Sequence, residues 1–89
     1  MQTDEQVRKA AKRRRTLEKS RKNVGSVIAI AIRDSNKNQA EVAAEIGMTA
    51  DMLSDIVTGQ RKAEIGEIQM IAKAIGEDPL TMIRRMLNW

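Results

Sequence analysis

The sequence contains no cysteine and no histidine, and Trp89 is its only aromatic residue. Without Cys and His it can form no disulfide and no zinc site of the usual kind, and it lacks the thiol nucleophile and the imidazole base of most hydrolases and transferases. Aromatic platforms for stacking single-stranded bases are missing as well. We therefore expect no enzymatic activity, no metal site and no cofactor.

Long apolar runs are also missing. No stretch approaches the roughly 18 apolar residues of a membrane span, and the polar first residues do not resemble a secretory signal. With 89 residues, the chain can form one small domain, whose size leaves little area for a deep substrate pocket. We expect a cytoplasmic protein that binds neither a membrane nor a small-molecule substrate.

Positive charge is concentrated at the start of the chain. Residues 1–23 hold nine Lys and Arg against three acids, a net charge of +6, whereas residues 24–89 have a net charge of −2. Such an arm is typical of polyanion binding, but it could equally be a solvated tail. The capping-box spacing of Thr3 and Gln6 predicts a marginal helix. The basic residues of the arm are Arg8, Lys9, Lys12, Arg13, Arg14, Arg15, Lys19, Arg21 and Lys22.

The remaining sequence, residues 24–89, predicts one all-α domain. Gly25 indicates a break over residues 23–26 that separates the arm from the domain. Apolar spacing then predicts helices over residues 27–35, 39–46, 50–57 and 65–75, and a fifth from residue 79. Gly47 and Gly76 follow predicted helices at positions that tolerate a left-handed backbone.

Residues 39–57 carry the most informative pattern, because two short helices meet there at a tight Gly47-Met48-Thr49 turn. A helix-turn-helix needs a small residue where its helices cross, which Ala43 supplies, and a glycine at the turn. Apolar residues must also hold the interhelical angle. These positions are occupied by Val42, Ile46, Met48, Leu53 and Ile56.

The segments Gln39–Thr49, Leu53–Lys62 and Ile68–Gly76 resemble the XRE family, to which the phage lambda and 434 repressors and Cro belong. The resemblance covers about residues 26–79. It implies a five-helix, all-α, lambda-repressor-like fold and a phage repressor/Cro-like transcriptional regulator that binds operator DNA by sequence; whether such a regulator represses or activates stays open. Its setting would be a prokaryotic cell or phage host, with double-stranded DNA as partner.

The resemblance also assigns roles to residues. Gln39, which opens the second helix, would contact a phosphate, although it could be an ordinary exposed residue. The loop after the third helix would contact phosphates through Thr58, Gln60, Arg61 and Lys62. The start of the third helix would read bases in the major groove through Thr49, Ala50, Asp51, Met52, Ser54 and Asp55.

This face departs from the family, which often places Gln, Arg, Ser or Asn there. Asp51 can accept from a cytosine amino group or simply stabilise the helix dipole, and Met52 can touch a thymine methyl or stay exposed. An alternative function is therefore a protein-interaction module on the same fold, such as an antitoxin or co-regulator. The acid pairs Glu41/Glu45 and Asp51/Asp55 fit solvated helix faces better than a metal site.

The last predicted helix has more apolar residues than one buried face needs, which indicates a weak homodimer. Family resemblance suggests two copies on a two-fold DNA site. We expect Leu80, Ile83 and Leu87 to pack on the domain core. The dimer contact would then fall to Met82, Met86 and Trp89, unless all six residues complete a core that lacks phenylalanine.

Overall fold

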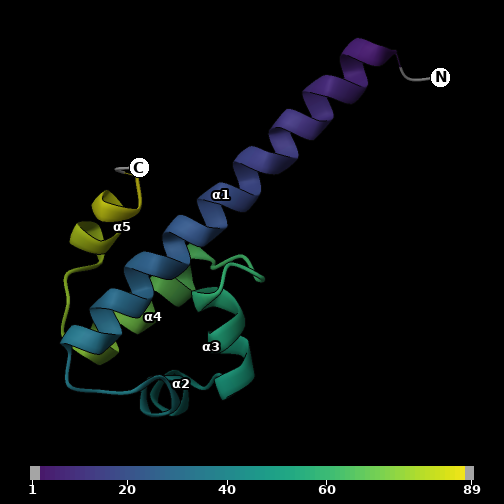
Figure 1. Cartoon of the computed structure of the whole chain (residues 1–89). Helices are drawn as coiled ribbons and strands as arrows, with labels where there is room; N and C mark the ends of the chain where they lie inside the picture. Colours follow the sequence, from purple (N-terminus) through teal and green to yellow (C-terminus); the bar gives the residue numbers. More distant parts are fainter. Residues whose placement is uncertain (1–2, 88–89) are drawn as a thin grey trace.

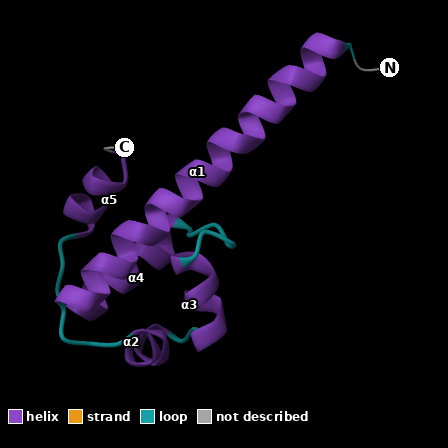
Figure 2. Ribbon diagram, viewed as in Figure 1, coloured by secondary structure: helices purple, strands orange, loops and turns teal. Residues whose placement is uncertain are grey.

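The computed structural model describes residues 3–87, which form five helices and no strand (Figures 1 and 2). The all-α prediction is confirmed. The helices are α1 (Asp4–Asp34), α2 (Gln39–Ile46), α3 (Ala50–Val57), α4 (Ile65–Ile75) and α5 (Pro79–Leu87).

Helix α1 runs unbroken through the position where a break is predicted, so the prediction of a break over residues 23–26 is wrong. Its 31 residues begin at a capping box formed by Thr3 and Gln6. The C-terminal half lies in the domain, while the N-terminal half projects beyond it (Figure 1). The predicted arm and the first helix of the domain are therefore one element.

Gly25 is a site of close packing rather than a helix end. It is one of the buried residues of α1, and a Cβ added to it would lie 2.3 Å from the carbonyl oxygen of Val57 and 2.5 Å from that of Ile56. The absence of a side chain therefore lets the C-terminal end of α3 approach the backbone of α1.

The core is aliphatic. Ile28, Leu53, Ile56 and Ile71 are fully buried at its centre, and no polar or charged residue among residues 3–87 is buried with them. Every helix contributes. The remaining buried residues are Ala31, Ile32, Val42, Ala43, Ile68, Ala72, Met82 and Met86.

Helix α5 buries a different set of apolar side chains from the one expected, although Ile83 packs against the core as predicted. Met82 is fully buried and Met86 is 7% exposed, whereas Leu80 is 68% and Leu87 72% exposed. The prediction that Met82 and Met86 form an exposed dimer contact is therefore wrong, and Trp89 lies outside the described residues. Unbranched methionine side chains adapt to irregular space, so they fill the gap that a core without phenylalanine leaves. Asn23 of α1 fixes α5 by donating a hydrogen bond from Nδ2 to the Met86 carbonyl.

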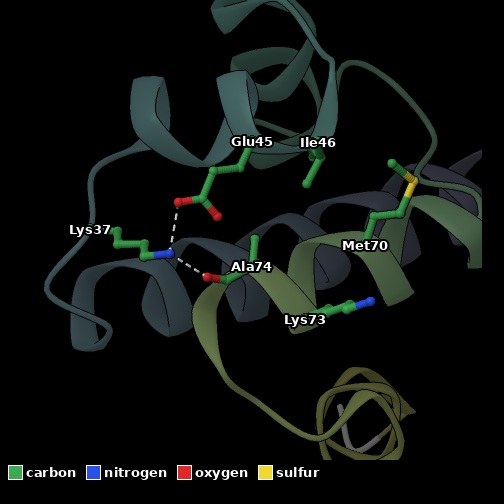
Figure 3. Close-up of a pocket in the computed structure, with 6 residues that line it drawn as sticks. All are labelled: Lys37, Glu45, Ile46, Met70, Lys73 and Ala74. Atoms are coloured by element: carbon green, nitrogen blue, oxygen red, sulfur yellow. Dashed lines mark hydrogen bonds and ion pairs between the residues drawn. The ribbon is translucent and has the colours of Figure 1, made fainter.

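Lys37 ties the α1–α2 connection to two other helices. Its Nζ atom donates to Glu45 Oε1 of α2 at 2.8 Å and to the Ala74 carbonyl at the end of α4 at 2.6 Å (Figure 3). Met70 and Lys73 line the same shallow pocket. A lysine near a helix C-terminus satisfies a carbonyl that has no partner within the helix, so this contact holds α2 against α4.

Candidate nucleic-acid interface

The helix-turn-helix forms where the sequence predicts it. Asn38 caps α2 by accepting from the Glu41 amide at 2.8 Å. Gly47 ends α2 with a left-handed φ of 74°, a conformation that glycine adopts without steric cost. Thr49 then caps α3 by accepting from the Met52 amide at 3.1 Å. Leu53 and Ile56 anchor α3 in the core, which leaves its other side free.

The exposed side of α3 carries most of the residues assigned to base readout. Ala50, Asp51, Ser54 and Asp55 are exposed and share one face, and Thr49 is exposed beside it. Met52 is partly buried at the edge of this face. The carboxylates of Asp51 and Asp55 take part in none of the ion pairs found within residues 3–87. The face is therefore polar, acidic and unobstructed.

Gln39 is the first residue of α2 and is partly buried. It follows the Asn38 cap, so it lies beside the amide groups at the start of the helix, where the helix dipole favours an anion. This position suits the phosphate contact that the resemblance implies.

The loop after α3 is held by hydrogen bonds to the end of α3 and by close packing against α1. The amides of Gln60 and Arg61 both donate to the Asp55 carbonyl, at 2.8 and 3.0 Å. Gly59 has a φ of +81°, and a Cβ there would lie 2.8 Å from Lys22 Cγ of α1. The loop thus rests directly on the helix that carries the basic arm (Figure 1).

Three of the predicted phosphate contacts in this loop are exposed, and the fourth is paired. Thr58, Gln60 and Lys62 are exposed. The Arg61 guanidinium lies 3.3 Å from Glu67 Oε2, with side chains 39% and 20% exposed. Because Glu67 offsets the charge of Arg61, Lys62 is the stronger candidate of the two for a phosphate contact.

The basic arm is helical throughout residues 4–23. All of its nine Lys and Arg side chains are exposed except Arg21, which is partly buried. Within the described part of the arm, Lys9 and Glu5 form an ion pair at 3.2 Å. The arm thus presents positive charge around most of its circumference, next to the loop that follows α3.

Sequence reasoning missed the meeting of arm and loop. Arg13, Leu17, Arg21 and Val24 of α1 share one groove with Lys62 and Ala63. Local patterns do not show such a contact, because these residues lie far apart in the sequence. The only local signal in the sequence was Gly25. Its role as a packing site is evident only from the backbone atoms of α3 that lie against it.

Residues 3–87 also bear on metal binding and membrane insertion. Within residues 3–87, no three acidic side chains gather as a metal site would require. None of the helices described is both long and apolar enough to cross a membrane.

Comparison with known proteins supports the fold. A family model described as helix-turn-helix matches residues 28–81. The crystal structure of the clp gene regulator ClgR from C. glutamicum superposes with a TM-score of 0.73 at 14% sequence identity, covering 78% of this chain and 90% of that one. No curated protein sequence matches the chain. The whole basic arm, residues 1–23, lies outside the family match.

Proposed function

Because the chain belongs to the helix-turn-helix family of the XRE type, that of the phage lambda and 434 repressors and Cro, we propose that it is a transcriptional repressor that binds double-stranded DNA by sequence. In this proposal α3 enters the major groove, while Gln39, the loop after α3 and the basic arm contact phosphates. The observation that carries it is the exposed face of α3 beside a loop that rests on α1, the helix whose arm holds nine basic residues.

Affinity and specificity then reside in different parts of the molecule. Phosphate contacts supply salt-dependent affinity, whereas side chains at base edges supply specificity. The α3 face contributes no positive charge, since it carries Asp51 and Asp55. The arm, with a net charge of +6 over residues 1–23, must therefore supply most of the electrostatic attraction. Such a regulator acts in the cytoplasm, where its DNA lies.

One substitution among the proposed base-reading residues and one among the proposed phosphate contacts test whether specificity and affinity are separate. Asp51→Ala should change which sequences are selected from random duplex DNA, because a carboxylate can accept from cytosine and a mismatched base pair in a specific site costs about 1–3 kcal/mol. Gln39→Ala should lower affinity for all sites by about fivefold without changing the preferred sequence, because it removes one hydrogen bond to phosphate. Sequencing of the selected DNA and titration of the best site give both quantities. A selection profile of Asp51→Ala identical to that of the unsubstituted protein would remove Asp51 from the reading face.

We also propose that two copies bind one two-fold site, with half-sites about one helical turn apart. The exposed Leu80 and Leu87 of α5 replace the methionines as contact candidates, because they are the large apolar side chains that α5 leaves in solvent. Buried apolar area of this kind drives association between copies.

Sedimentation with a selected duplex tests the dimer. The protein should bind as two copies, and Leu80→Lys with Leu87→Lys should reduce this to one copy and weaken binding by at least about tenfold. The fold should persist because both side chains are exposed. Met70→Lys, a change at a residue that is 48% exposed on α4, is the control and should leave two copies. One copy per duplex at saturation for the unsubstituted protein would contradict the proposal.

The acidic face of α3 supports a second candidate, a protein-interaction module such as an antitoxin or a co-regulator. Asp51 and Asp55 are exposed and free of ion pairs within the described chain, so they could receive a basic surface of another protein. Salt-dependent binding of duplex DNA by the purified protein separates the two candidates, since the interaction module does not require it.

A further inference from the structure

A groove opens where the arm meets the loop after α3. It has a volume of about 490 Å³ and is formed by one side of α1 and by the residues that lead into α4. Three cations stand around it, and the remaining lining is apolar except for one hydroxyl. The lining residues are Arg13, Leu17, Ser20, Arg21, Val24, Lys62 and Ala63.

Among residues 3–87, no acidic group forms an ion pair with the cations of this groove. Arg13, Arg21 and Lys62 take part in none of the five ion pairs found within residues 3–87, and the lining contains no acidic residue. By contrast, Arg61, the neighbour of Lys62, is paired with Glu67. Three positive groups that face one groove repel one another, so an anion placed between them is favoured by all three.

Arg21 adds a second, independent indication. Its Nε atom is shielded from solvent and has no hydrogen-bond partner among the residues that the structure describes. A shielded donor without an acceptor costs free energy. Arg21 lines the groove, so an anionic oxygen bound there would supply an acceptor for its guanidinium. Arginine suits this role because its planar fork matches the oxygens of a phosphate.

The apolar part of the lining narrows the choice of anion. Leu17 is 52% exposed, and with Val24 and Ala63 it forms a hydrocarbon surface beside the cations. A free inorganic anion makes no use of such a surface. A phosphodiester does, since each backbone phosphate of DNA carries a deoxyribose whose carbon atoms can pack against Leu17 and Ala63.

We propose that the arm–loop groove is a phosphate-binding site, occupied in the DNA complex by a single backbone phosphate that Arg13, Arg21 and Lys62 hold together. The inference rests on the proposed function and deepens it. The arm and the loop bind the same phosphate instead of contacting the DNA backbone at separate positions. Because α1 continues unbroken into the core, this contact fixes the direction in which the arm leaves the domain along the DNA.

Neutral methylphosphonate groups, placed one at a time along a selected duplex, locate the phosphate. One position should lower the affinity of the unsubstituted protein by about tenfold, since it removes a charge-assisted contact. Arg13→Gln and Lys62→Gln should each bind more weakly and should both become insensitive to that same position. The control Arg8→Gln, a cation of the arm outside the groove, should keep full sensitivity there. If Arg13→Gln and Lys62→Gln lose sensitivity at different positions, there is no shared site, although the proposed function stands.

A titration with inorganic phosphate, followed by the Nε–H resonance of Arg21, separates this inference from the proposed function. If the protein binds no duplex DNA, the proposed function fails. A saturable shift of the Arg21 resonance that is lost in Arg13→Gln then still supports a phosphate site, filled from free phosphate. Absence of both DNA binding and the shift overturns the site as well.

Discussion

Gly25→Ala should lower the free energy of unfolding by about 2–3 kcal/mol, although alanine is the better helix former by about 1 kcal/mol. The reason is steric. The added Cβ would lie 2.3 Å from the Val57 carbonyl oxygen and 2.8 Å from its carbon, so α3 would have to move away from α1. Both atoms belong to the backbone and cannot turn aside like the end of a side chain. The melting temperature should fall by roughly 10–20 °C.

Gly66→Ala is the matched control for this change. Gly66 is also helical, but a Cβ there meets nothing within 4 Å. Its replacement should therefore raise stability slightly, by up to about 0.5–1 kcal/mol. Thermal or urea unfolding of both variants measures the contrast. A Gly25→Ala protein as stable as the unsubstituted one would show that α3 does not need the close approach.

Removal of residues 1–16 should produce the largest loss of DNA affinity. This segment holds six of the nine Lys and Arg of the arm and two of its three acids. If about four of these cations neutralise phosphates, affinity at moderate salt should fall by about 10²–10³, and the slope of log affinity against log salt should become shallower by about 3–4. The truncation ends before Leu17 because Arg21 and Lys22 lie against the loop.

Stability should change little in the same truncated protein. Residues 3–16 are exposed apart from Ala11, which is partly buried, and they contribute nothing to the core. A thermal melt serves as the control, since it should stay close to that of the full chain. Sequence preference in DNA selection should also persist, because α3 is intact. An unchanged salt slope in the truncated protein would show that the arm does not contact DNA.

The sequence was sufficient for the elements whose signals are local. The α2–turn–α3 unit follows from Asn38, Gly47 and Thr49, since each acts on its neighbours through capping or a left-handed backbone. The exposed face of α3 follows from the spacing of Leu53 and Ile56. Such features depend on a few consecutive residues, so a single sequence reveals them.

Other features depended on contacts between distant segments. Gly25 looks like a helix break until α3 is seen against it. On α5, Leu80 with Leu87 and Met82 with Met86 are both apolar sets at helical spacing, so periodicity alone does not choose the buried one. The shape of the space beside α1 and α4 decides it, and the flexible methionines fit. The groove between the arm and the loop also depends on contacts between segments that are far apart in the sequence, so local patterns do not predict it.

The continuity of α1 also bears on how the arm becomes helical. An isolated basic segment of this length would be mostly unfolded in water, because starting a helix costs more free energy than extending one. Here the folded domain supplies the starting turns around Ile28, and the helix propagates outward from them toward Thr3. Fraying should consequently increase with distance from the core, and helicity of the outer turns is lost at temperatures where the domain is still folded. Phosphates along the arm would oppose this fraying, so DNA binding and helix propagation favour each other.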